Sequence, residues 1–304
     1  MSYSFLRESK LYIVYGGNKY RIHTSTAISF SQTFAQDSYS VKTLHNQSKM
    51  FEGATITKAN PADFSFNVPL TVEKDESPVV DLLSELNSGQ LTSFDMYVET
   101  GSAVFKLTNA VITSGSFDIN PRNQFTLQLQ GEGTKLERVG DESYSIPGNL
   151  ANESATRTPL LVYPVVSIDS LDMNNIISTT LTIENEVDWT AYSTLQKSLN
   201  VTNASNIMRP SNYTVNNRTI SGAVRQYQTD NNITQFDDFS TTSNITIKAI
   251  RVGDAANATP FLQLNLNPAT FTARMETGET FAQSYDFRNL DNSTTVPNII
   301  TQYS

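Results

Sequence analysis

The chain has 304 residues, 38% of them hydrophobic, and a formal net charge of −9, and for this length about two domains are the usual expectation. It contains no cysteine, which excludes thiol nucleophiles, thiolate metal sites and disulfides and favours intracellular folding. Both halves are mildly acidic without a Lys/Arg cluster, which argues against tight DNA binding, and we expect neither a signal peptide nor a membrane span because no long apolar run occurs.

The first elements in chain order are a β-hairpin and a half-buried strand. Residues 11–15 and 20–23 predict the hairpin, because the glycines between them tolerate the positive φ of a tight turn. Apolar and polar residues then alternate, with Ile28, Phe30 and Phe34 on one face. This two-residue period predicts a strand that buries one side.

Residues 36–53 are polar and show no clear period. We predict a long loop there, and a long loop inside a compact domain is usually functional or disordered. The adjacent apolar Met50 and Phe51 favour packing against a partner. We expect this loop, and a second one near residues 197–212, to contact neighbouring subunits. The candidate contact residues in the two halves are Asp37, Tyr39, His45, Met50, Phe51, Trp189 and Tyr192.

One helix is predicted, over residues 77–89. Ser77 can cap it, Pro78 fits the first helical position, and Gly89 can end it in a left-handed conformation. Apolar side chains recur at helical spacing, at Val79, Leu82, Leu83 and Leu86. The helix should therefore lie across a sheet.

The remaining elements of the first half are strands. We predict them over residues 54–57, 64–70, 94–99, 103–109, 110–119 and 125–130. Phe125, Leu127 and Leu129 alternate with polar residues in the clearest two-residue period of the chain. Residues 140–164 carry three prolines and little periodicity, so we interpret this stretch as an interdomain connection.

The order of elements recurs in the second half. Leu181 and Ile183 run into DWTAYSTLQKSL as Ile28 and Phe30 run into DSYSVKTL. Strands are then predicted over residues 213–228, 245–252, 261–266, 270–275 and 281–287, and the short segment 234–239 takes the place of the helix. An internal repeat of this kind predicts a duplicated architecture, although an all-β chain can repeat such elements by chance.

Signatures of catalysis and metal binding were sought as well. His23 and His45 are the two histidines, and no Asp or Glu spacing around them matches a metal site. Phosphate loops, nucleophile elbows and dinucleotide-binding glycine motifs are lacking. Trp189 and Tyr192 can form either an aromatic platform for a carbohydrate or peptide, or a core or interface anchor. We expect no enzymatic activity and no cofactor.

Three segments carry a resemblance to a known family: SFSQTF at residues 29–34, GATITKANPADFSF at residues 53–66 and FAQSYDF at residues 281–287. In these segments and in the repeat, the chain resembles the tail tube proteins of long-tailed bacteriophages. The resemblance implies an all-β fold of two tandem β-sandwich or barrel-forming domains, each with a short flanking helix and a long loop. We assign residues 1–145 to the first domain, 146–165 to a linker and 166–304 to the second.

The resemblance also implies a function. Such proteins form rings of six domains that stack into the tube through which DNA leaves the capsid, so a duplicated chain implies a homotrimeric ring with pseudo-sixfold symmetry. The implied partners are other copies, the tape-measure, baseplate or distal tail and terminator proteins, and a sheath in some tails. The implied location is the virion tail, assembled in the host cytoplasm.

Two alternatives stay open at this point. One is a tail terminator or distal tail protein of the same fold, which acts in a single ring. The other is a β-sandwich module that binds a receptor or a carbohydrate. An acidic wall of Ser, Thr, Asn and Gln would let DNA pass without gripping it, although acidic surfaces also serve solubility alone.

Overall fold

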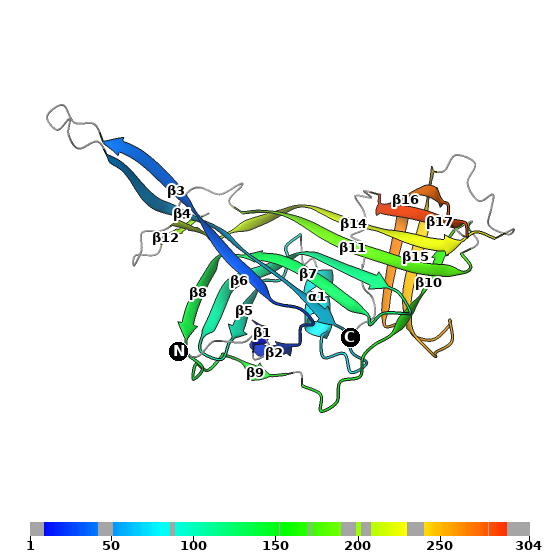
Figure 1. Cartoon of the computed structure of the whole chain (residues 1–304), viewed down its shortest axis with the longest axis horizontal. Coiled ribbons are helices and arrows are strands. Elements are labelled where there is room, and N and C mark those ends of the chain that lie inside the picture. Colours follow the sequence, from blue (N-terminus) through cyan, green and yellow to red (C-terminus); the bar gives the residue numbers. More distant parts are fainter. Residues whose placement is uncertain are drawn as a thin grey trace.

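The computed structural model describes residues 9–41, 51–85, 89–151, 153–169, 171, 173–189, 199–201, 208–229, 240–278 and 280–290. Its described residues form strands and one helix, arranged along an elongated body (Figure 1). The elements are β1 (Lys10–Tyr15), β2 (Asn18–Ile22), β3 (Ser29–Val41), β4 (Phe51–Pro69), α1 (Ser77–Ser84), β5 (Phe94–Glu99), β6 (Val104–Ile119), β7 (Thr126–Gly133), β8 (Lys135–Gly140), β9 (Asn149–Leu150), β10 (Val162–Ile168), β11 (Ile176–Trp189), β12 (Leu199–Val201), β13 (Met208–Pro210), β14 (Tyr213–Tyr227), β15 (Ser240–Arg251), β16 (Leu262–Glu276) and β17 (Ala282–Asn289). The all-β prediction is confirmed.

The two halves pair their strands in the same order. In the first half the antiparallel ladders run β3–β4–β7–β6–β5–β1. In the second half they run β11–β14–β17–β16–β15–β10. The two halves thus repeat not only the order of elements predicted from the sequence but also the order in which the strands pair. We call these halves the first and the second repeat. The domain bounds themselves stay a prediction.

β6 joins the two repeats because it is long enough to serve two sheets. Its first residues, 104–108, pair with β5 and β8. Residues 114–117 lie between β7 and β11, and the pairing with β11 runs on to Ile119, so a strand of the second repeat continues the sheet of the first. The result is a long sheet in the order β3, β4, β7, β6, β11, β14, β17, β16, and it does not close into a barrel within one chain.

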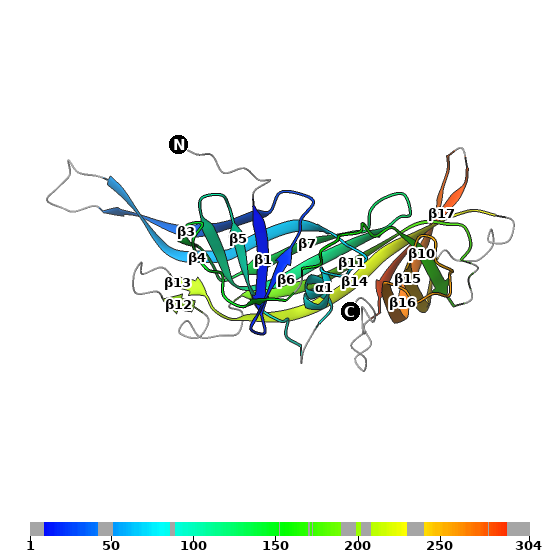
Figure 2. The ribbon, with the colours of Figure 1, turned by 90° about the horizontal axis from the view of Figure 1, so that it is seen from below.

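The core lies between this long sheet and a smaller layer, made of β1, β2, β5 and α1 in the first repeat and of β10 and β15 in the second. Figure 2 shows the helix beneath the strands it covers. α1 confirms the predicted helix with Pro78 in its first turn, but it ends at Ser84, before Gly89, and no side chain caps its start. A Cβ on Gly115 of β6 would lie 2.4 Å from Leu83 Cδ2, so a larger residue there would require the Leu83 side chain to move. The second helix slot, residues 234–239, lies outside the described residues.

The loop predicted over residues 36–53 is wrong where it falls on described residues. β3 and β4 form one long hairpin, paired from Ser29↔Ser65 out to Val41↔Phe51, which projects from the body (Figures 1 and 2). Its ladder is made by backbone groups, which pair without an apolar face, so a polar sequence without a period does not exclude it. We call the part of this hairpin beyond Ala35 the arm.

The connection after β8 is fastened to the first repeat. Leu160 is fully buried and exchanges backbone hydrogen bonds with Leu70 and Phe125, and Pro159 bridges to Thr71. The predicted lack of regular structure holds for most of this stretch, but the segment is not a free linker. Its contacts fix where the second repeat begins.

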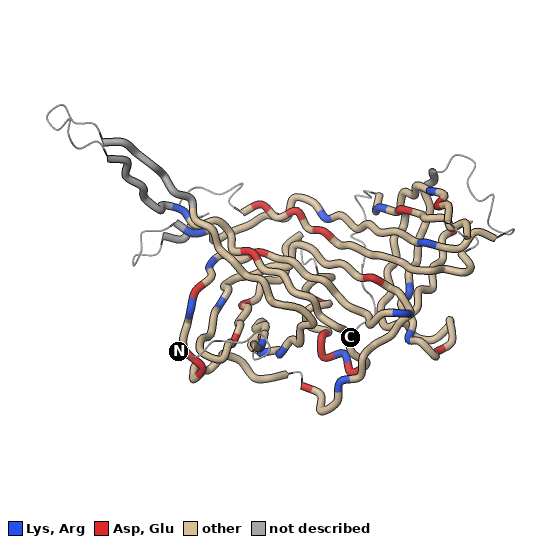
Figure 3. Tube along the Cα trace, in the orientation of Figure 1, with Lys and Arg blue, Asp and Glu red and all other residues tan. Residues whose placement is uncertain are grey.

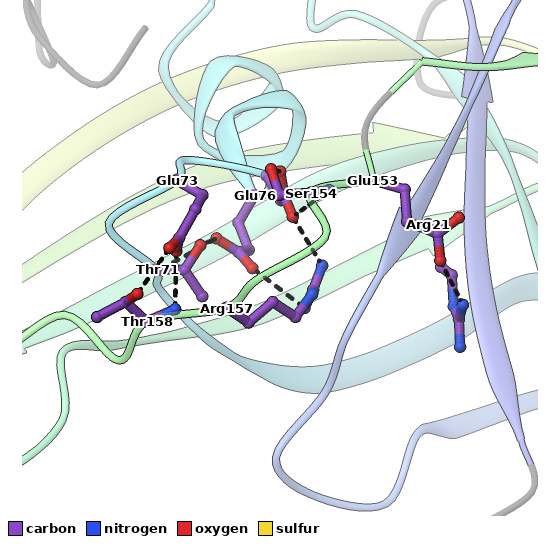
Figure 4. Close-up of polar contacts among 9 residues, drawn as sticks. Arg21, Thr71, Glu73, Glu76, Glu153, Ser154, Arg157 and Thr158 are labelled. Carbon is purple, nitrogen blue, oxygen red and sulfur yellow. Dashed lines mark hydrogen bonds and ion pairs between the residues drawn. The ribbon is translucent and has the colours of Figure 1, made fainter.

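A cluster of charged side chains holds the same connection, and we call Asp75, Glu76 and Arg157 the clasp (Figure 4). Arg157 contacts Asp75 Oδ2 at 3.2 Å and Glu76 Oε1 at 3.6 Å. The two carboxylates are 6% and 1% exposed, so they depend on this cation. Thr71 Oγ1 donates to Glu76 Oε2 at 2.7 Å, and Ser154 Oγ donates to Asp75 Oδ1 at 2.7 Å. Burial nevertheless raises the pKa of Glu76.

A substitution at Gly131 of β7 tests how tightly the long sheet is packed. A Cβ there would lie 2.2 Å from Phe64 Cζ and 2.3 Å from the Val111 carbonyl oxygen, and the backbone oxygen cannot move away cheaply. Overpacking of this kind costs about 1–3 kcal/mol, so we expect Gly131→Ala to lose about 3 kcal/mol of unfolding free energy. Gly278→Ala is the control, because its nearest neighbour, Thr280 O, is 3.6 Å away. Equal urea midpoints for the two variants would contradict the packing.

Candidate functional site: the open face of the long sheet

One face of the long sheet is polar from its first strand to its last. Directly paired residues of neighbouring strands point to the same side, so a chain of pairs traces this face across the sheet. The pairs are Ser31↔Asp63, Asp63↔Glu132, Ser65↔Gln130, Ser114↔Gln130, Glu184↔Ser114, Glu184↔Thr219, Ser221↔Arg288 and Thr272↔Asp286. We call this surface the open face. The intervening residues, such as Phe66, Leu129 and Ile183, are buried in the core.

The first repeat and the junction make the open face acidic. Asp63, Glu184 and Glu186 are exposed on it. Figure 3 shows acidic positions along β11 and on neighbouring strands. Two depressions, of about 300 and about 460 Å³, lie side by side here, and Gln130 lines both. Apart from Phe64 and Gly131, they are lined by Ser, Thr, Asn, Gln and carboxylate side chains and one cation, Arg288.

The second repeat carries the cations of the open face, and two of them are paired. Arg225 Nε contacts Glu276 Oε2 at 2.7 Å, and Arg274 Nη2 contacts Asp286 Oδ2 at 2.9 Å. These ion pairs are exposed and contribute little to stability. They do leave this part of the face close to neutral, so the acidic character is concentrated near β4, β7 and β11.

Trp189 anchors the junction between the repeats. It is 8% exposed and packs with Val111 and Leu91, and its ring centroid is 5.2 Å from that of Tyr213. Its Nε1 donates to Glu132 Oε2 at 2.5 Å. Burial raises the pKa of Glu132, and the hydrogen bond from the indole acts against that rise. Trp189 is thus placed as a core anchor and not as an exposed aromatic platform. A contact between Trp189 and another subunit stays a prediction.

Two further buried contacts cross the junction. Arg218 Nη2 of β14 donates to the Leu83 carbonyl oxygen at the end of α1, at 2.5 Å, and burial lowers the pKa of Arg218 to about 10. Asn185 Nδ2 of β11 donates to the Ile112 carbonyl oxygen at 3.2 Å. Together with the β6–β11 ladder, these contacts hold the open faces of the two repeats in one continuous surface.

The other predicted contact residues fall partly on the arm and partly outside the described residues. Asp37 and Tyr39 are in the outer part of β3, paired with Thr55 and Gly53, and Phe51 begins β4. His45, Met50 and Tyr192 lie outside the described residues. No described contact unites these positions into one site, so their role in assembly stays a prediction.

The acidic residues of the open face were not predicted as site residues from the sequence. Glu184 and Glu186 lie in the alternating segment 181–187, which carries the signal that would have shown them sharing a face. Glu132 lies between two glycines, Gly131 and Gly133, and carries no comparable signal. Its pairing with Asp63 depends on strand order, which a single sequence does not reveal.

Comparison with known proteins gives one clear match. A model of the Bacteriophage Baseplate Tube Protein Family matches residues 1–303. No curated protein matches the chain. Among the residues that the structure describes, there is no helix of the length and apolarity needed to cross a membrane.

Proposed function

Because the chain belongs to the bacteriophage baseplate tube protein family, we propose that it is a structural virion protein that assembles with copies of itself into rings lining the DNA passage of the tail. The family places it among phage tail proteins. Ring formation, stacking and the passage of DNA go beyond the family and are our proposal, as is a purely structural role without catalysis.

The observation that carries the proposal is the open face. The long sheet buries a mainly apolar inner side and presents its polar side over eight strands, β3, β4, β7, β6, β11, β14, β17 and β16. A protein grips DNA by neutralising phosphates with Lys and Arg, which releases counterions. Asp63, Glu132 and Glu184 are acidic instead, and a wall that carries negative charge repels the negatively charged phosphates of DNA. This face suits the lining of a conduit through which DNA slides.

The repeat supports a ring of three copies. Each chain contributes two copies of one four-strand unit, so three chains place six such units around an axis. A long sheet that stays open within one chain has two edges, which invite pairing with other chains, and closure into a ring removes them. We therefore propose a homotrimeric ring with pseudo-sixfold symmetry.

The arm supports contact along the axis. It extends the β3–β4 ladder beyond the strands that pack in the body. We propose that it reaches the next ring or another tail protein, with Asp37, Tyr39 and Phe51 on its strands among the contacts. The partners proposed for the ends of the assembly are the tape-measure, distal tail and terminator proteins, and assembly would take place in the host cytoplasm.

A second candidate is a ring restricted to the distal end of the tail. The family description names the baseplate as well as the tube, which favours a short stack at the baseplate over a tube of full length. Both candidates share the ring and its lining. The number of stacked rings separates them.

The lining can be tested by labelling, because the chain has no cysteine of its own. We expect Glu184→Cys to react with a small maleimide in both free chains and assembled particles, but with a 20 kDa polyethylene glycol maleimide, a size of about that of a small protein, only in free chains. Glu142→Cys, in an exposed turn away from the open face, is the control and should react with both reagents. Equal labelling of the assembled Glu184→Cys particles by the bulky reagent would contradict a lumenal position.

A further inference from the structure

The two repeats differ in what lies beside one strand. In the first repeat, the C-terminal half of β6 has β7 on one side, as far as Phe117, and β11 on the other side, over residues 114–119. β16 is the corresponding strand of the second repeat and has β17 on one side. If the repeats were alike, the other edge of β16 would pair with a strand equivalent to β11.

That place is partly filled by the chain itself. The first residues of β15, 240–243, pair with β16 from Ser240↔Thr272 to Ser243↔Ala269. We call residues 240–243 the strap. β5 is the strand of the first repeat that corresponds to β15. It begins at Phe94, which pairs with Ala110, and the preceding Leu91 packs against Trp189 and Val111, so β5 does not extend along the part of β6 that pairs with β11. The strap therefore lies where the first repeat admits β11.

The strap is attached more weakly than the strand it replaces. Its sequence is Ser-Thr-Thr-Ser, without an apolar side chain, and Thr242 is exposed. It is separated from the rest of β15 by a register shift between Ser243 and Ile245. By contrast, β11 buries Leu181 and Ile183 completely. Besides its backbone ladder, the strap makes a side-chain hydrogen bond, from Ser243 Oγ to the Asp169 carbonyl oxygen at 3.0 Å. Hydrogen bonds of this kind give a small net stabilisation, whereas the apolar burial of β11 adds to it.

A second copy offers a strand that fits this place. β3 corresponds to β11 in the repeat, and among the described strands it pairs with β4 alone, leaving its other edge open. Phe30 of β3, and Ile28 just before the strand, stand in the positions of Ile183 and Leu181 and are only partly buried. On the receiving strand β16, Met275 is 43% exposed. Both edges thus leave apolar surface uncovered.

We propose that the strap covers the edge of β16 that receives β3 of a second copy, and that the strap leaves this edge when the ring closes. In the free chain it protects an open sheet edge from unspecific pairing. This inference rests on the proposed ring. It adds the two edges that meet, and a segment of the chain that must move before they meet.

A reversible disulfide tests the movement. Thr242 and Thr270 are paired across the strap and β16, and both are exposed on the same face. In Thr242→Cys/Thr270→Cys, oxidation should lock the strap and leave the protein monomeric, and reduction should restore rings. Thr246→Cys/Asn265→Cys joins the same two strands beyond the register shift and should form rings in both states. The readouts are solution mass and negative-stain images of the same samples.

A second variant loosens the strap. Thr241→Gly/Thr242→Gly lowers the β-propensity of the strap, so half-assembly should occur at a several-fold lower protein concentration than in the wild type. Rings from the oxidised Thr242→Cys/Thr270→Cys protein, or unchanged half-assembly in the glycine variant, would overturn the strap and leave the ring standing. A monomer at all concentrations for the wild type, the reduced variants and the glycine variant would overturn the ring, and the strap with it.

Discussion

Deleting residues 37–52, with Gln36 and Gly53 joined by an Asn-Gly turn, should leave rings that no longer stack into long particles. The deletion removes the arm but keeps the inner ladder from Ser29↔Ser65 to Ala35↔Lys58, where β4 also meets β7. The core contacts of β4, including Phe64 and Phe66, are untouched. The fold and the ring should therefore survive, because neither depends on the removed segment.

The measurement for the arm deletion is particle length in negative-stain images, with solution mass for the ring. Removal of residues 255–257, in the exposed connection between β15 and β16, is the control and should not change particle length. Particles of normal length from the arm deletion would rule out a role of the arm in stacking. Loss of the rings themselves would instead place the arm in contacts within a ring.

Replacing Arg157 by Met should cause the second large effect, a loss of stability. The substitution keeps an apolar stem but leaves Asp75 and Glu76 buried without their cation. Breaking a buried ion pair from one side costs about 3–5 kcal/mol. Since the Arg157 side chain is 25% exposed, we expect the lower end, about 3 kcal/mol, measured as a shift of the urea midpoint.

The control for the clasp is Arg138→Met. Arg138 is exposed and makes a single hydrogen bond, of 3.4 Å, to the Gly140 carbonyl oxygen. Its loss should change the unfolding free energy by less than about 0.5 kcal/mol. Equal midpoints for the two variants would show that the clasp does not hold the connection to the first repeat.

The clasp also predicts a pH dependence with a definite sign. Burial raises the pKa of Glu76 above its ordinary 4.5, and the hydrogen bonds from Thr71 and the charge of Arg157 act against that rise. Without Arg157 the pKa of Glu76 rises further. In the folded variant the Glu76 carboxyl is therefore protonated at a pH at which the same carboxyl of the unfolded chain is still ionised. The variant's stability therefore increases as the pH falls from 7 toward 4.5, and its deficit relative to the wild type should shrink. A deficit that is constant over this range would contradict the role assigned to Glu76.

Those parts of the fold that depend on local pattern were predictable from the sequence. The turn at Gly16 and Gly17, the helix that begins near Pro78, and the alternation around Leu127 each follow from conformational preference or period. The order of elements in the second half also pointed to the repeat. The ladders then supplied what the sequence lacked, which strand pairs with which.

The arm and the strap could not be predicted in this way. Both are paired through backbone groups, and their sequences, such as the Ser-Thr-Thr-Ser of the strap, carry no hydrophobic period. The open face needed one more step, because Asp63 and Glu184 come from separate repeats and share a surface only through the β6–β11 ladder. Trp189 was predicted from the sequence as a possible anchor, but its hydrogen bond to Glu132 is evident only from the structure.

The most direct test of the account is negative-stain imaging of the purified chain together with its solution mass. We predict hollow rings, stacked at high concentration, with a mass of three copies per ring. Three copies would show the ring and establish that the two repeats of each chain alternate around it. A monodisperse monomer at high concentration, for the wild type and for the chain with a loosened strap alike, would contradict the account and favour a β-sandwich binding module.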